Sequence, residues 1–296
     1  MLSLAIGIVA ALAVACSDQV DVGVEGVDAR WIDVEGSDAR RALLVTPAVD
    51  GERAPMGADP PLVVVLHGLG QDAEHMAGIG GWPNLAADRG AVVAFADGWK
   101  NSWNAGTCCG DAMTDGVDDV AYLDALIDTV AKRTRSDRGD VYMVGFSNGA
   151  MMTYRYLCEG SVRLRGAASI AGTDVDGCTP DRPTDVIQIT GSDDEIVPLN
   201  SSTSAMASLG TLVPASRAIE QVATAFACPA QRTEQSGPAR STRWDPCAEG
   251  VAVRLDVIAG LTHTYPSVDG YDGTSEILEF WGWADGGLPA GKLAGS

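Results

Sequence analysis

Residues 145–149 read Gly-Phe-Ser-Asn-Gly, a G-x-S-x-G pattern centred on Ser147. The pattern alone is common by chance, so its context decides its meaning. The apolar run at residues 141–144 predicts a buried strand that leads into it, and the residues from Ala150 onward predict a helix that leaves it. In such a strand–turn–helix elbow the glycines remove side chains that would clash, which leaves the serine hydroxyl exposed. Ser147 is therefore the predicted nucleophile.

A serine hydroxyl needs an adjacent base, and the chain has three histidines. His67 precedes the nucleophile at the end of a buried strand, and His75 lies in a polar segment where we expect it to be exposed. His263 follows the last long predicted strand, residues 251–258, which places it at the same sheet edge as Ser147. It also completes the chain order serine, acid, histidine. His263 is the predicted base.

The acid should lie between the two, after the preceding strand at residues 186–189. Residues 190–198 contain Asp193, Asp194 and Glu195 there. The carboxylate must accept the Nδ1 proton of His263 and stabilise the imidazolium. Spacing does not choose between Asp193 and Asp194.

Two backbone amides are expected to form an oxyanion hole. One is the amide after the nucleophile, Asn148, and the other belongs to the turn after the first buried strand. The segment His-Gly-Leu-Gly-Gln at residues 67–71 supplies this turn, and Leu69 is the predicted second donor. A turn with only a structural role is the alternative.

Aromatic side chains are candidates for substrate contact. Trp103 and Tyr265, together with Trp99, are predicted to line a cleft, although buried packing residues would give the same pattern.

Asp118 and Asp119 stand where a helix is expected to begin, so we interpret them as capping residues rather than metal ligands. No metal site and no cofactor are predicted.

Strands and helices alternate along most of the chain. Continuous apolar runs, typical of strands buried on both faces of a parallel sheet, occur at residues 62–66, 91–96, 141–144, 186–189 and 251–258. Helical patterns are found at residues 117–132, 150–158 and 276–283. Residues 20–48 alternate apolar and polar side chains and predict antiparallel edge strands. The expected fold is a doubly wound, mostly parallel α/β sheet of the α/β-hydrolase type.

Composition limits the partners and the location. A formal charge of −20 argues against nucleic acid and anionic lipid as partners.

Residues 1–15 form a short apolar run, which predicts a signal peptide rather than a membrane span. The run ends at Ala-Val-Ala-Cys, which resembles a lipoprotein cleavage site with Cys16 as a lipid anchor, although Leu12 stands one place early and no basic residue precedes the run. We therefore expect an extracellular or cell-envelope lipoprotein whose residues 16–296 form one monomeric domain.

Six further cysteines suggest disulfides in an exported chain. Cys228 and Cys247 flank a polar loop and are the expected pair. Cys108 and Cys109 are expected not to pair, because neighbouring Cα atoms lie closer than a relaxed disulfide prefers.

These segments together resemble the polyhydroxybutyrate depolymerase and feruloyl esterase family, in particular its exported, lipoprotein-like bacterial esterases. The resemblance extends over residues 61–283. It is carried by the motifs at residues 66–68, 81–82, 103–110, 117–120, 145–152, 191–198 and 263–266. It implies that the acid stands three places before the Val-Pro pair, which selects Asp194, and that the Asn148 and Leu69 amides pair around the oxyanion. Tyr265 replaces a tryptophan that is frequent in the family.

The resulting expectation is an exported serine esterase that forms an acyl-enzyme. Its predicted substrate is a polyhydroxybutyrate-like polyester, with feruloyl or acetyl esters of plant polysaccharide as the alternative. A catalytically inactive surface protein that uses the same scaffold for binding is the alternative from another functional class. A cysteine-dependent redox protein is a weaker possibility because no CxxC motif is present.

Overall fold

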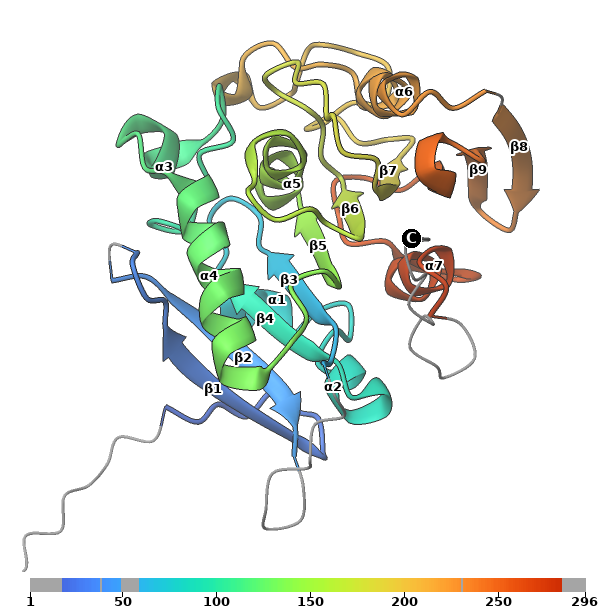
Figure 1. Ribbon diagram of the computed structural model, residues 1–296. Helices are drawn as coiled ribbons and strands as arrows, with labels where there is room; N and C mark the ends of the chain where they lie inside the picture. Colours follow the sequence, from blue (N-terminus) through green and yellow to red (C-terminus); the bar gives the residue numbers. More distant parts are fainter. Residues whose placement is uncertain (1–17, 38, 49–58, 230, 284–296) are drawn as a thin grey trace, which may run out of the picture.

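The computed structural model describes residues 18–37, 39–48, 59–229 and 231–283, and most of these residues belong to one α/β unit. Its main sheet has ten strands in the order β1-β2-β4-β3-β5-β6-β7-β10-β9-β8 (Figure 1). The strands are β1 (Val27–Asp33), β2 (Arg41–Pro47), β3 (Leu62–Leu66), β4 (Val92–Ala96), β5 (Val141–Phe146), β6 (Gly166–Ile170), β7 (Asp185–Gly191), β8 (Gln231–Ser236), β9 (Ala239–Trp244) and β10 (Val253–Ile258). The six central strands, β4, β3, β5, β6, β7 and β10, are parallel to one another, and the strands at both edges pair antiparallel. The predicted fold class is confirmed.

Helices cover both faces of the sheet (Figure 1). They are α1 (Ala73–Ala77), α2 (Asn84–Arg89), α3 (Gly110–Thr114), α4 (Asp119–Thr134), α5 (Asn148–Glu159), α6 (Ala215–Ala225) and α7 (Gly273–Phe280). Along β3, Leu62, Val64 and Leu66 belong to the core that includes α4, α5 and α6, whereas Val63 and Val65 belong to the core that includes α1, α2 and α7. Because side chains alternate along a strand, a continuous apolar run supplies both cores.

The sequence prediction missed three strands of the main sheet and the short antiparallel pair β11 (Ser267–Val268) and β12 (Tyr271–Asp272). Strand β6 reads Gly-Ala-Ala-Ser-Ile, and its small side chains give a weak apolar signal although every residue is buried. Strands β8 and β9 form an antiparallel hairpin at the sheet edge, where the sequence predicted only a polar loop between two cysteines. The residues of β8 are all exposed, so no apolar alternation marks it.

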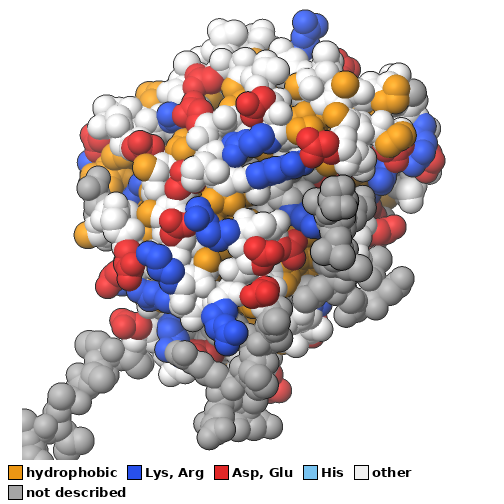
Figure 2. All heavy atoms as spheres, viewed as in Figure 1, with side chains coloured by type: hydrophobic (Ala, Val, Ile, Leu, Met, Phe, Trp, Pro, Cys, Tyr) orange, Lys and Arg blue, Asp and Glu red, His pale blue; other side chains and the backbone are white. Residues whose placement is uncertain are grey.

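The carboxyl ends of the parallel strands meet at one edge, where the loops after β3, β5, β7 and β10 lie together. Ligands of open α/β sheets bind at this edge. On the face shown in Figure 2, basic and acidic side chains are interspersed rather than gathered in separate patches. Within the described ranges, no helix combines the length and apolar character needed to cross a membrane. The predicted signal peptide, residues 1–15, and Cys16 lie outside the described residues.

Candidate active site

Ser147 stands in the sharp turn between β5 and α5, with φ of 53° and ψ of −115°. This positive φ is strained for a non-glycine residue. Both neighbouring glycines are required by close packing. A Cβ on Gly145 would lie 2.2 Å from the Gly149 carbonyl oxygen, and one on Gly149 would lie 2.5 Å from the His67 carbonyl oxygen. The sequence therefore forms a nucleophile elbow, as its G-x-S-x-G pattern predicted.

The structure brings Ser147, His263 and Asp194 together although they lie on three loops. The Nε2 atom of His263 is 2.8 Å from Ser147 Oγ. The Nδ1 atom of His263 is 2.8 Å from Asp194 Oδ2. In the tautomer that this arrangement favours, Nδ1–H donates to the carboxylate and Nε2 can accept the serine proton. The geometry is that of a Ser-His-Asp triad.

Asp194, rather than Asp193, contacts the histidine. Its second oxygen, Oδ1, accepts backbone hydrogen bonds from Ile196 and Val197 at 2.9 and 2.8 Å, and the residue is buried. Asp193 is exposed and accepts a hydrogen bond from Ser192. The sequence spacing left this choice open, and the family resemblance selected the same aspartate that the structure places beside His263.

Leu69 and Asn148 are the two predicted oxyanion donors. Leu69 occupies a turn in which the Gln71 amide donates to the Gly68 carbonyl at 3.1 Å, and Asn148 is the first residue of α5. Neither the Leu69 nor the Asn148 amide donates a hydrogen bond to another described residue. Both residues line the pocket that contains Ser147. Two free amides beside the nucleophile are what an oxyanion hole requires.

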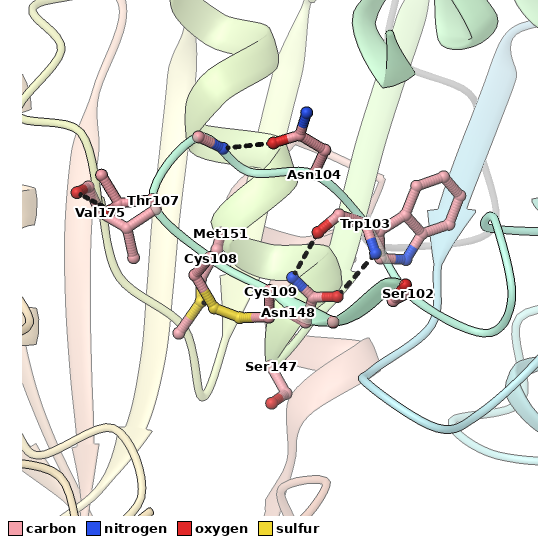
Figure 3. Close-up of a disulfide and its surroundings, with 12 residues drawn as sticks. Ser102, Trp103, Asn104, Thr107, Cys108, Cys109, Ser147, Asn148, Met151 and Val175 are labelled. Carbon is pink, nitrogen blue, oxygen red and sulfur yellow. Dashed lines mark hydrogen bonds between the residues drawn. A yellow bond between two sulfur atoms is a disulfide. The ribbon is translucent and has the colours of Figure 1, made fainter. Parts of the chain in front are cut away.

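The side chain of Asn148 holds the loop that follows β4 (Figure 3). Its Oδ1 accepts from the Trp103 amide at 2.8 Å, and its Nδ2 donates to the Trp103 carbonyl at 3.0 Å. The Trp103 indole N–H in turn donates to the His67 carbonyl at 2.8 Å. These bonds connect the elbow to the turn that carries Leu69.

His67 is buried and belongs to this framework rather than to the reacting groups. Its Nδ1 lies 2.8 Å from the Gly68 carbonyl, and its Nε2 accepts from the Gly98 amide at 2.9 Å. Burial lowers the pKa of His67 to about 4, which keeps the ring neutral near pH 7. His75 on α1 is exposed, as predicted.

The predicted aromatic contacts are not at the pocket surface. The Trp103 side chain is completely buried, which is the packing alternative named above. The Tyr265 hydroxyl accepts from Trp82 Nε1 at 3.0 Å and bonds Thr274 at 2.6 Å, so it fixes the loop of His263 to α7. Trp99 donates to Asp115 at 2.8 Å. The structure thus gives no support for substrate contact by Trp103 or Tyr265.

A pocket of about 240 Å³ opens over Ser147. Its other walls were not predicted, and they come from the loops after β3, β4 and β7, from the end of β5 and from α5. The additional lining residues are Gly68, Gln71, Cys109, Phe146, Met151, Ile196, Met206 and Leu209. One signal was available in the sequence, because Met151 stands four places after Ser147 and therefore shares its helix face. A more open cleft of about 500 Å³ lies between α4 and α5 and includes none of the three triad residues.

Three disulfides are present among the described residues. Cys228–Cys247 is the predicted pair and is confirmed, and Cys158–Cys178 is a second. The expectation that Cys108 and Cys109 do not pair is wrong. The structure joins the sulfur atoms of these adjacent residues even though their Cα atoms are only 3.1 Å apart, so the Cα distance alone did not decide the pairing.

The acidic pair at the start of α4 is used structurally. Asp118 accepts from the Ala121 amide at 2.9 Å as the helix N-cap. Asp119 is buried, pairs with Arg40 and accepts from the Asn104 amide at 2.6 Å. Burial raises the pKa of Asp119, and the Arg40 charge opposes this shift. Among the residues that the structure describes, no group of three or more acidic, histidine or cysteine side chains could hold a metal ion.

Solved structures show the class of the fold. The acetyl xylan esterase from Aspergillus awamori matches with a TM-score of 0.61 and 16% identity over 86% of this chain and 99% of that chain. MGS-M1, an alpha/beta hydrolase from a Medee basin deep-sea metagenome library, matches with a TM-score of 0.53 and 11% identity over 87% of this chain and 95% of its own. The fold is therefore that of the α/β hydrolases.

Relatives identified by sequence narrow the class of α/β hydrolase to which the chain is similar. A protein named "Putative esterase NocK" from Nocardia uniformis subsp. tsuyamanensis is 30% identical over 226 residues, 70% of this chain and 65% of the relative. Feruloyl esterase B of Piromyces equi is 27% identical over 232 residues, 74% and 42% of the two chains. The bifunctional acetylxylan esterase/xylanase XynS20E of Neocallimastix patriciarum is 26% identical over 222 residues, 72% and 30%.

The predicted resemblance to feruloyl esterases is confirmed, because the chain is a homologue of proteins named esterase, feruloyl esterase and acetylxylan esterase. The chain spans between 30% and 65% of the length of these three relatives. No protein-family model matches it. The polyhydroxybutyrate depolymerase part of the resemblance stays a prediction.

Proposed function

We propose that this chain is a serine carboxylester hydrolase with Ser147 as nucleophile, His263 as general base and acid, and Asp194 as the residue that orients His263. The observation that carries the proposal is the pair of 2.8 Å contacts that His263 makes, to Ser147 Oγ and to Asp194 Oδ2. A binding protein has no need of this chain of hydrogen bonds at the base of an open pocket.

In the acylation step, Ser147 Oγ forms a bond to the ester carbonyl carbon while its proton moves to His263 Nε2. The carbonyl oxygen becomes an anion that the Leu69 and Asn148 amides stabilise. The tetrahedral intermediate then collapses, the bond to the alcohol oxygen breaks, and the Nε2 proton passes to that oxygen. Asp194 stays ionised and stabilises the imidazolium that forms in between.

Water completes the cycle. His263 takes a proton from the water, the hydroxide attacks the acyl-enzyme carbonyl, and the same two amides donate hydrogen bonds to the second oxyanion. Collapse releases the carboxylic acid and returns the proton to Ser147. These steps need no group beyond the residues named and the water.

Feruloyl or acetyl esters of plant polysaccharide are the proposed substrates, because relatives over about seven-tenths of this chain carry feruloyl esterase and acetylxylan esterase names. A polyester of the polyhydroxybutyrate kind is the second candidate. Its support is the resemblance of the motifs at residues 103–110, 145–152 and 263–266 to the polyhydroxybutyrate depolymerase and feruloyl esterase family. Export and lipidation at Cys16 belong to this proposal too.

The test compares the purified chain with Ser147→Ala and with Ser201→Ala, an exposed serine away from the pocket. Substrates are 4-nitrophenyl acetate, methyl ferulate, acetylated xylan and polyhydroxybutyrate film. We expect Ser147→Ala to lower kcat by about 10⁶, as loss of a triad nucleophile does elsewhere, and Ser201→Ala to keep it. The preferred ester then chooses between the two substrate candidates. Equal rates in Ser147→Ala and wild type would remove Ser147 from the mechanism, and a folded wild type inactive on all four would favour a binding protein.

A further inference from the structure

The Cys108–Cys109 disulfide lies in the loop that the Asn148 side chain holds against the elbow (Figure 3). The loop is fixed on its other side as well. The Thr107 amide donates to Asp176 Oδ1 at 3.1 Å, and the Thr107 hydroxyl donates to the Val175 carbonyl at 2.7 Å. Because it is anchored on both sides, the disulfide has a fixed position relative to Ser147.

The disulfide forms part of a sulfur-containing wall. Cys109 Sγ lies 3.9 Å from Met151 Sδ, and Figure 3 shows the Met151 side chain beside the disulfide. Both residues are almost completely buried, and both line the pocket that contains Ser147. Cys108 is buried behind Cys109 and does not line the pocket.

The chemistry of this wall favours flat apolar groups. A disulfide and a thioether are polarizable and weak hydrogen-bond partners, and methionine sulfur makes favourable contacts with aromatic rings. The surrounding lining residues are mostly apolar as well, with Phe146, Ile196 and Leu209 among them. A planar unsaturated or aromatic group would therefore replace water at this wall without losing hydrogen bonds.

We propose that the Cys108–Cys109 disulfide and Met151 form a specificity-determining wall that contacts the acyl group of the ester and favours flat unsaturated or aromatic acyl groups. This inference rests on the proposed function, since it concerns the same pocket. It assigns a role to a disulfide that a purely structural cross-link would not have.

The test measures kcat/KM on 4-nitrophenyl esters that share one alcohol and differ in the acyl group, cinnamoyl against acetyl. The variants are Cys108→Ala with Cys109→Ala, and Met151→Leu, which keeps the apolar volume and removes the sulfur. Cys228→Ala with Cys247→Ala removes a disulfide that does not line the pocket and is the matched control. We expect the cinnamoyl-to-acetyl ratio to fall about tenfold in the double alanine variant and about threefold in Met151→Leu, and to be unchanged in the control.

A binding measurement separates this inference from the proposed function. Calorimetry with methyl cinnamate on the Ser147→Ala background requires no turnover, and the same cysteine and methionine changes should weaken binding by similar factors. If wild type hydrolyses no ester, the proposed function fails while the binding result still decides the role of the wall. Unchanged ratios and affinities in either folded variant, or equal losses in the Cys228/Cys247 control, would overturn the inference.

Discussion

Asp194 is held at both carboxylate oxygens, one by His263 and the other by the Ile196 and Val197 amides. Asn at this position would keep the size of the side chain but would remove the charge that holds the Nδ1–H tautomer. We expect Asp194→Asn to lower kcat by about 10⁴ with little change in KM. Steady-state kinetics on a soluble ester measures this. Asp193→Asn is the control, and the assignment fails if Asp193→Asn loses the activity while Asp194→Asn keeps it.

His67 should make stability depend on pH. Its folded pKa of about 4 lies below the ordinary histidine value of 6.5 that applies in the unfolded chain. Between these values the unfolded chain binds more protons, so the free energy of unfolding decreases as pH falls through this range, by up to about 3 kcal/mol from this group.

Urea unfolding of wild type and His67→Gln between pH 4 and 7 tests this expectation. The difference in stability between the two should shrink as pH falls from 6.5 to 4. His75→Gln, at an exposed site, should show a constant difference from wild type. A constant difference for His67→Gln as well would contradict the account.

The nucleophile elbow depends on the close approach of helix α5 to strand β3. A Cβ on Gly149 would meet the backbone of both His67 and Leu66, at 2.5 and 2.6 Å. Because backbone cannot rotate away as a flexible side chain can, we expect Gly149→Ala to cost at least about 3 kcal/mol of stability and to abolish activity. Thermal unfolding and an ester assay measure both. Gly78→Ala, whose Cβ would approach no atom closer than 3.5 Å, should be nearly neutral. Normal activity in Gly149→Ala would show that the elbow tolerates separation from β3.

The elements that position the triad could be predicted from the sequence because each has a strong local signal. Strand β3 was predicted with its observed bounds, and β5, β7 and β10 to within a few residues, since all are continuous apolar runs. Strand β6 and the hairpin of β8 and β9 were missed because small or exposed side chains carry no such signal.

The pocket walls could be predicted less well than the triad. Met206 and Leu209 reach the pocket from the segment between the acid and the base, and their place in the same pocket as Ser147 depends on the three-dimensional course of that loop. Trp103 was misplaced for a related reason, since its sequence neighbours do not show that its indole packs against His67 and Tyr122. Local patterns identify reacting residues, whereas pocket shape comes from tertiary contacts.

The net charge of −20 opposes folding, because the excess acidic side chains repel one another in the compact chain. Added salt screens charges farther apart than about 10 Å at 0.1 M ionic strength. We therefore expect the melting temperature at pH 7 to rise by about 2–4 °C between 20 and 500 mM NaCl, as a gain of about 1 kcal/mol would give. Scanning calorimetry measures this. Near pH 4.3, the isoelectric point of the sequence, the same salt increase should have little effect. A melting temperature that falls with salt at pH 7 would show that attractive ion pairs outweigh the repulsion.

The assignment of Ser147 as the activated nucleophile is tested most directly by covalent labelling. An alkyl fluorophosphonate reacts with a serine whose proton an adjacent histidine can accept. Wild type, Ser147→Ala and His263→Ala are treated with it, and intact mass and peptide mapping locate the adduct. The account predicts one adduct, on Ser147, absent from Ser147→Ala and formed much more slowly in His263→Ala. A folded wild type that takes up no label, or takes it up at another residue, would contradict the account.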